Sequence, residues 1–308
     1  MANLNPVEKT SLAIPRAKLL ELSKLGPLGA IGDILLEWAF IIGAAWLCNR
    51  HFHPALYLLA IIWIGSRQHS LGTIMHDGSH WRAHNSRTVN DFITEFFCAW
   101  PLFFRMEAYR YWHLQHHQHT GTDKDPDYTR DRHPTSRKEI LIQMVLDAFS
   151  LNAIKQMKVG KRIESAPVTK KTQVLRVLYY TTVFTLITLL GGWKVYLLYW
   201  VVPMATFMRL ALNVRQMADH AGLGKTTEEG LIRTTRTLVP NALERILFFP
   251  RNTSYHLGHH LYMSVPSKNL AKLHDELEKY EIYRVEGRRT QGFIGMLNEF
   301  PWEERKSS

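Results

Sequence analysis

Histidines in three short clusters are the chemically most informative residues of this chain. The 308 residues include 16 histidines, and the first cluster pairs His76 with His80. The second and third clusters share the pattern HxxHH, and a lone His220 precedes the third. Residues three and four apart lie on one face of a helix, so each cluster brings its imidazoles together. The full set is His76, His80, His113, His116, His117, His220, His256, His259 and His260.

The number of these histidines indicates more than one metal ion. Imidazole is a ligand suited to iron, zinc and copper. A tetrahedral zinc ion takes four ligands, so nine histidines predict two metals, each with an open position. A structural role explains a single histidine pair better than three clusters. Cys48 and Cys98 both lie in apolar stretches, which excludes a secreted disulfide scaffold and a cysteine-based zinc site.

Four apolar blocks must position the clusters. A helix of roughly 20 apolar residues crosses a hydrocarbon core about 30 Å thick. Blocks of this kind occupy residues 31–47, 54–75, 174–190 and 193–212. A shorter stretch at 92–104 contains Pro101 and is predicted to be re-entrant or interfacial. Its aromatic side chains are candidates for the wall of an acyl tunnel, or for anchors at the membrane interface. They are Phe92, Phe96, Phe97, Trp100, Phe103 and Phe104.

The basic residues indicate the orientation of these blocks. The links between the first and second blocks and between the third and fourth are short, whereas most Lys and Arg lie elsewhere. By the positive-inside rule the basic regions are cytoplasmic. We therefore predict an all-α integral membrane protein with about four transmembrane helices in two hairpins and a cytoplasmic helical cap holding a di-metal site. Cytoplasmic tails at 1–29 and 281–308 would flank a membrane domain at 30–280.

The basic surplus does not require a nucleic acid partner. The formal net charge is +11, which an anionic inner leaflet explains. The sequence contains no Gly-rich phosphate loop and no nucleic-acid motif.

The three clusters and their flanks resemble the membrane fatty acid desaturase superfamily over about residues 30–280. HDGSH, HLQHH and HLGHH match the order and spacing of its three histidine boxes. HQHTGTDKDPD is similar to the segment that follows its second box, and RQMADHAG to the segment that supplies one further histidine. The chain departs from many members at Gly258, where they carry Glu.

The resemblance implies a non-haem di-iron centre that activates O₂, with the nine histidines above as its ligands. Carboxylates or amides beside such ligands orient the imidazoles through the other ring nitrogen. The candidates are Asp77, Asp219, Gln216 and Asp125, with Asp123 and Asp127 as alternatives. His84 and His119 are weaker metal candidates, for which a helix-surface or loop role is the alternative.

The function that the resemblance implies is an O₂-dependent desaturase that introduces a C=C bond into an acyl-lipid or acyl thioester. A di-iron hydroxylase or ketolase of a lipid, carotenoid or alkane is the alternative, and a non-redox metal-binding membrane protein is a remote one. The chain has no flavin or NAD fingerprint, so an external electron donor is expected, either a ferredoxin or a small cytochrome with its reductase. The expected location is a membrane, with the bacterial inner membrane favoured and the site on the cytoplasmic side.

Overall fold

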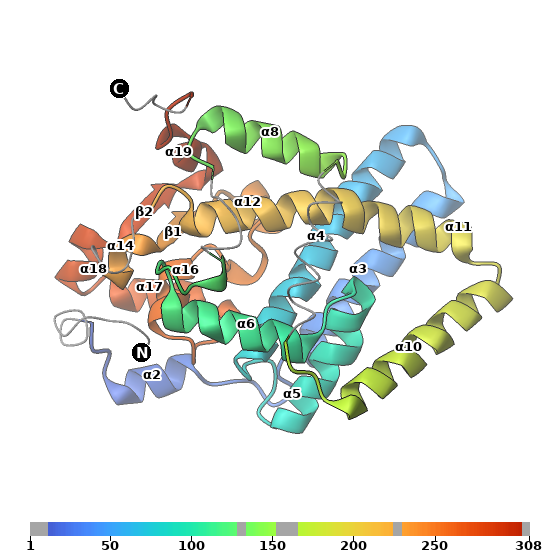
Figure 1. The fold of residues 1–308 in the computed structure, drawn as a ribbon, viewed down its shortest axis with the longest axis horizontal. Helices are drawn as coiled ribbons and strands as arrows, with labels where there is room; N and C mark the ends of the chain where they lie inside the picture. The colour runs from blue at the N-terminus through green and yellow to red at the C-terminus, as the bar shows by residue number, and fades with distance from the viewer. Residues whose placement is uncertain (1–11, 128–133, 152–165, 224–229, 304–308) are drawn as a thin grey trace.

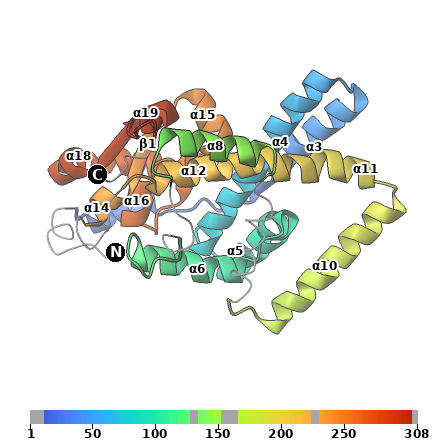
Figure 2. The same ribbon diagram turned by 45° about the horizontal axis from the view of Figure 1, so that its top comes forward.

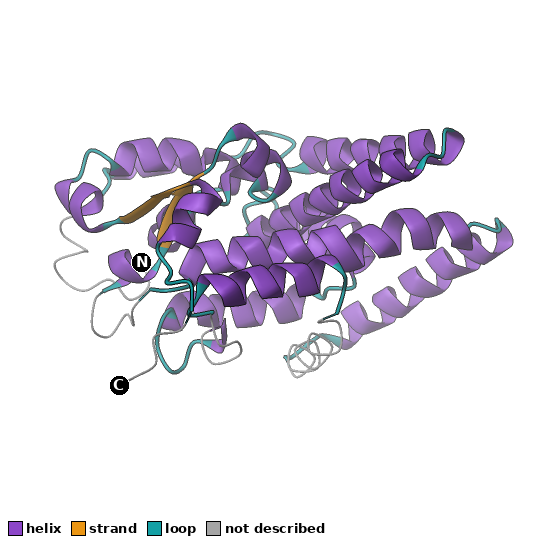
Figure 3. Ribbon diagram, turned by 90° about the horizontal axis from the view of Figure 1, so that it is seen from above, coloured by secondary structure: helices purple, strands orange, loops and turns teal. Residues whose placement is uncertain are grey.

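Two long helical hairpins form one end of the molecule, and a cap of shorter helices forms the other. The computed structural model describes residues 12–127, 134–151, 166–223 and 230–303. The hairpin tips lie at the same end, away from the cap helices such as α14 (Leu231–Thr234) and α18 (Glu281–Glu286) (Figures 1 and 3). This arrangement matches the prediction of two hairpins that share one orientation.

The first hairpin joins α3 (Ile31–Arg50) to α4 (Pro54–Ser79) through a three-residue turn. The turn forms because the Nδ1 of His53 accepts the backbone N–H of Ala55, and Pro54 begins the helix, where its missing N–H costs nothing. From Ile64 onward every residue of α4 except the half-buried Gly72 is buried, so this half of the helix extends from the hairpin into the body of the protein.

The second hairpin joins α10 (Lys170–Leu189) to a continuous helical rod. The rod begins as α11 (Trp193–Tyr196), passes through the π-helical turns Leu197–Val201 and Met204–Met208, and ends as α12 (Arg209–His220). No described residue of α10 is buried, and Figure 2 shows this helix standing away from the body.

The α4 helix and the rod approach each other closely at Gly65. A Cβ atom at this position would lie 2.8 Å from the backbone nitrogen of Met208 and 3.0 Å from the carbonyl oxygen of Pro203. Only glycine permits this backbone approach, which fixes how α4 and α12 enter the cap together.

The cap is built around α6 (Met106–His119) and α16 (His256–Leu261). Leu12, Ile14 and Leu22 are buried in one cluster with Tyr262 and its neighbours, so the described residues ahead of α3 pack on the cap. The other cap and connecting helices are α2 (Arg16–Leu22), α5 (Arg87–Thr94), α8 (Arg137–Ala148), α14 (Leu231–Thr234), α15 (Ala242–Leu247), α17 (Leu270–Leu277), α18 (Glu281–Glu286) and α19 (Gly292–Asn298).

The prediction of an all-α protein was wrong in one detail, because the cap contains a small parallel sheet. Strand β1 (Arg236–Val239) pairs with β2 (Arg288–Gln291), with Arg236 opposite Arg288. Neither RTLV nor RRTQ alternates apolar and polar residues, so the pattern that indicates a half-buried strand is missing. The pairing joins residues beyond 281, predicted to be a tail, to the centre of the cap.

Helices occupy all four of the predicted spanning blocks. Among the described helices, two are both long enough and apolar enough to cross a membrane. These are Ile31–Arg50 and Trp193–His220. The α4 helix carries polar residues such as Arg67, Gln68 and His69 in its buried half, and α10 begins with Lys170 and Lys171. These polar residues lower the mean hydropathy of both helices. The topology with four membrane spans therefore stays a prediction.

Candidate metal centre

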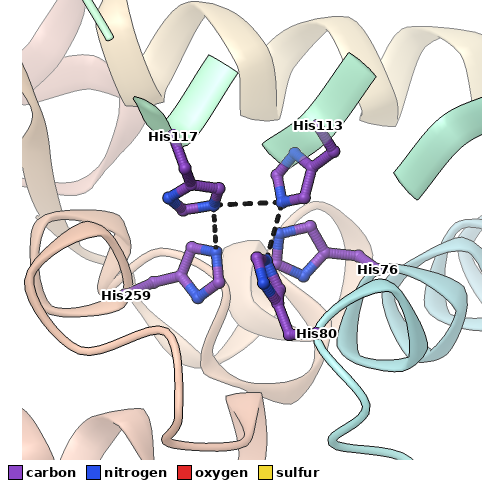
Figure 4. A group of neighbouring side chains, drawn as sticks. All are labelled: His76, His80, His113, His117 and His259. Atoms are coloured by element: carbon purple, nitrogen blue, oxygen red, sulfur yellow. Dashed lines mark hydrogen bonds between the residues drawn. The ribbon is translucent and has the colours of Figure 1, made fainter. Parts of the chain in front are cut away.

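The structure brings the nine predicted histidines together in two groups. Group A comprises His76, His80, His113, His117 and His259, and group B comprises His116, His220, His256 and His260. Within each group one ring nitrogen of every histidine lies within 4.8 Å of the others. Figure 4 shows the imidazoles of group A pointing toward one another from α4, α6 and α16.

The two HxxHH clusters contribute to both groups in complementary ways. In α6, His113 and His117 belong to group A, and His116, which directly precedes His117, belongs to group B. In α16 the pattern is reversed, because His256 and His260 belong to group B and His259 to group A. Adjacent helical residues point about 100° apart at 3.6 residues per turn, so each HH pair divides between two sites.

The nitrogen spacing in both groups suits a metal. In group A the Nε2 atoms of His80 and His117 lie 2.9 and 3.1 Å from Nε2 of His113. In group B Nε2 of His256 lies 3.0 Å from Nε2 of both His220 and His260. Two ligands at right angles around a metal, each about 2.1 Å from it, would be about 3.0 Å apart.

His76 differs from the other members of group A in its lack of hydrogen-bond partners. Both ring nitrogens of His76 are buried without a hydrogen-bond partner among the described residues. Such an orphaned group is costly unless it binds something that protein hydrogen bonds do not provide. A metal ion satisfies it, and the all-imidazole donor set fits iron, zinc or copper.

The same burial keeps the imidazoles in the form that binds metal. Burial, and then repulsion among neighbouring imidazoles, holds the pKa of most members of the two groups well below the usual range for histidine. These are His80, His113, His117, His256, His259 and His260. A neutral imidazole offers a lone pair to a metal, whereas a protonated one does not.

Asp125 lies where a residue that orients a ligand is expected. Its Oδ1 is 2.9 Å from Nδ1 of His116, and it also accepts the backbone N–H groups of Gly121 and Asp127. Burial alone would raise the pKa of Asp125, but the hydrogen bond with His116 and the backbone donors outweigh it and lower that pKa. Asp125 therefore directs the other nitrogen of His116 toward group B.

The other predicted carboxylates occupy different positions. Asp77 accepts the backbone N–H and the hydroxyl of Ser267, and its closest approach to Nδ1 of His76 is 4.0 Å. Asp77 thus joins the end of α4 to the segment after α16. Asp219 lies 3.1 Å from Nε of Arg215 and 3.7 Å from Nε2 of His256, at the edge of group B.

The remaining candidates lie outside both groups. The Nδ1 of His84 accepts the backbone N–H of Ser86, which makes His84 part of a turn. His119 ends α6, where its carbonyl oxygen accepts from Thr122. Gln216 is half-buried on α12, one turn before His220, and its contact with a metal stays a prediction.

Thr120 is a contact of the centre that the sequence did not reveal. Its hydroxyl donates to the carbonyl oxygen of His116 at 2.7 Å and lies 3.2 Å from Nδ1 of His260. Because the hydroxyl hydrogen is committed to His116, Nδ1 of His260 must be the donor in the second contact. That fixes the His260 tautomer with the lone pair of Nε2 facing group B. The only signal in the sequence is that Thr120 is four residues after His116, on the same helix face.

These features define a helical protein with two adjacent buried groups of histidines, each of which could hold a metal ion, at the end of its hairpins. The model of the family described as fatty acid desaturase matches residues 52–289, and the chain belongs to this family. A curated relative is the dihydrorhizobitoxine desaturase of Bradyrhizobium elkanii, which is 28% identical over 264 residues, covering 80% of this chain and 75% of the relative. The chain is accordingly a desaturase-like oxidoreductase.

Proposed function

We propose that this protein is an O₂-dependent membrane desaturase that introduces a C=C bond into an acyl chain, with one iron in each histidine group. The observation that carries the proposal is the division of the nine histidines into two adjacent groups. Two irons held there would supply the oxidising power for removing hydrogen from an unactivated C–H bond, which no amino-acid side chain supplies.

The residues of the chain would hold and orient this centre. Group A offers five nitrogens and group B four, so metals that take six ligands would keep open positions for O₂. Asp125 and Thr120 fix the tautomers of His116 and His260. Burial of the imidazoles excludes bulk water from the site and keeps the ligands neutral. Neutral ligands would leave a higher positive charge on the metals than carboxylate ligands would.

A groove lined by residues of α5, α6 and α10 suits an apolar substrate. A cavity of about 680 Å³ lies between α10, the first turn of α6 and the π-helical turn Glu95–Ala99 (η1), and its lining is mostly apolar. Phe92, Phe96 and Trp100 line it, as expected for three of the six aromatic residues proposed as a tunnel wall. Arg110, also in the lining, donates to the carbonyl oxygens of Gly78 and Ser79, between His76 and His80.

The substrate class follows from this setting. An acyl-lipid or acyl thioester would enter the groove from the membrane, with the site on the cytoplasmic side of what we infer to be a bacterial inner membrane. The relative named above is a desaturase of dihydrorhizobitoxine, so a specialised chain is included in this class. Electrons would come from a separate ferredoxin, or from a small cytochrome with its reductase.

Mass spectrometry of cellular lipids and metabolites tests the proposal. Cells that express the chain are compared with cells that express the His259→Ala variant. Products lighter by two hydrogen atoms, absent with the variant, would support desaturation. Products heavier by one oxygen atom would reassign the centre to a hydroxylase or ketolase. A single zinc per chain with neither product would favour a non-redox metal protein.

A further inference from the structure

His220 lies at the end of its helix, where residues outside that helix must hold it. It is the last residue of α12 and is half-buried, whereas the other three members of group B are buried. Helix ends fray more readily than helix interiors. The Nδ1 of His220 lies 3.4 Å from the carbonyl oxygen of Thr234, and its Nε2 lies 3.0 Å from Nε2 of His256. Since a carbonyl oxygen only accepts, Nδ1 carries the hydrogen and Nε2 offers its lone pair to group B.

Arg236, two residues after Thr234, binds the helix end that carries His220. It belongs to β1 and is 1% exposed. Its Nη1 donates to the carbonyl oxygen of Ala218 at 2.8 Å, and its Nη2 donates to that of Ala221 at 3.1 Å. The last carbonyl groups of a helix have no partner within it, and a cation at this end also complements the helix dipole. One guanidinium group thus holds the backbone on both sides of His220.

Glu299 fixes the guanidinium group of Arg236. The Nη2 of Arg236 donates to Oε2 of Glu299 at 2.7 Å, and the hydroxyl of Thr290 donates to the other carboxylate oxygen. A fully buried arginine is rare unless its charge is paired. Thr290 lies in β2 and Glu299 follows α19, so both come after residue 289, where the match to the family model ends. The ion pair therefore connects the C-terminal segment to the helix end that carries a predicted metal ligand.

We propose that Arg236, held by Glu299, is a positioning residue for His220, and that the segment from β2 to α19 is in this way part of the metal site. The inference rests on the proposed function only in taking group B as a metal site, and it applies to iron and zinc alike. The planar fork of a guanidinium group is essential, because it reaches two carbonyl oxygens and a carboxylate at once. Loss of these contacts would free the end of α12 without deleting any ligand.

Arg236→Lys tests the inference, because lysine keeps the positive charge but its compact ammonium group does not reproduce the fork. The full chain is loaded with ferrous iron under anaerobic conditions, and metal release is followed during a chelator titration. The release curves of His220→Ala and His80→Ala identify the steps that belong to group B and group A. We expect Arg236→Lys to bind the metal of group B about 10- to 100-fold more weakly and to leave the release from group A unchanged.

Arg288→Lys is the matched control. Arg288 lies opposite Arg236 in the β1–β2 pairing, but it is exposed. This variant should release both metals as the unmodified protein does. Equal release curves for the two lysine variants would overturn the inference. Equally early release from both groups in Arg236→Lys would overturn it too, because that result indicates a general loss of cap stability rather than a displaced His220.

Glu299→Gln decides the question if Arg236→Lys does not fold. Glutamine keeps an oxygen for Arg236 but removes the charge that pairs with it, so we expect a loss of about tenfold in the affinity of group B alone. Glu303→Gln is its control, because Glu303 pairs with Lys138 at the surface. Identical release from these two glutamine variants would overturn the inference. The proposed function fails separately: selective release from a zinc-loaded protein that forms no lipid product would support the role of Arg236 and contradict desaturation.

Discussion

His116 and His117 are adjacent in the sequence, yet their imidazoles belong to different histidine groups, with ring centroids 5.7 Å apart and ring planes at 64°. His259 and His260 divide in the same way from the opposite helix. Each pair of adjacent histidines therefore links the two groups through a single peptide bond. Because of this connection, a shift in α6 or α16 moves ligands in both groups at once.

Thr120→Val should weaken metal binding in group B. The substitution removes the acceptor for Nδ1 of His260 and the donor to the carbonyl oxygen of His116 at nearly unchanged size. Loss of a contact that orients a metal ligand lowers metal affinity by about 10- to 100-fold. A chelator titration should thus release one of the two metals much earlier than in the unmodified protein.

Thr122→Val is the matched control for this prediction. Thr122 also donates its hydroxyl to a carbonyl oxygen, that of His119, but it contacts neither group. Equal metal release from the two variants would show that Thr120 acts only on the helix end.

Gly78→Ala should destabilise the protein and displace the end of α4. An added Cβ would lie 2.5 Å from Cγ2 of Thr94 and 2.7 Å from Cε of Met106. The methionine can move, but the β-branched Thr94 cannot without shifting its helix. Overpacking of this kind costs about 1–3 kcal/mol in the free energy of unfolding, measured here from denaturant midpoints.

Gly72→Ala in the same helix provides the comparison, because a Cβ there would meet nothing within 4 Å. Alanine favours a helix over glycine by up to about 1 kcal/mol, so this variant should be as stable as the unmodified protein or slightly more so. A Gly78→Ala variant as stable as Gly72→Ala would contradict the packing described for the end of α4.

The metal-free protein should lose stability as the pH falls below about 6.5, the ordinary pKa of histidine. Burial lowers the pKa of several group members, among them His113, His117 and His260. Below that pH the unfolded chain binds protons that the folded chain does not, so the free energy of unfolding rises with pH and is lost on acidification. The effect is measured as the unfolding midpoint of the metal-free protein at a series of pH values. These are spaced about one unit apart, from pH 8 down to about pH 5, on both sides of that pKa. Equal midpoints throughout would show that these histidines are protonated freely in the folded state.

The sequence predicts which histidines come together better than it predicts which other residues contact them. Helical spacing brings His113 and His117 together, and the four apolar blocks coincide with helices. The contacts around the histidines depend on tertiary structure. Thr120 meets His260 across 140 positions, and the β1–β2 pairing joins Arg236 to Arg288, so neither follows from local periodicity.

The role of a carboxylate beside the histidines depends on tertiary contacts in the same way. Asp77 was expected to orient His76, but its hydrogen bonds go to Ser267, in a segment that lies 190 positions later.

The iron content of the purified protein tests the central claim most directly. The full chain is reconstituted with ferrous iron under anaerobic conditions, and metal and protein are quantified together. The account predicts two irons per chain, one for group A and one for group B. A single metal per chain, or zinc retained in place of iron, would contradict it.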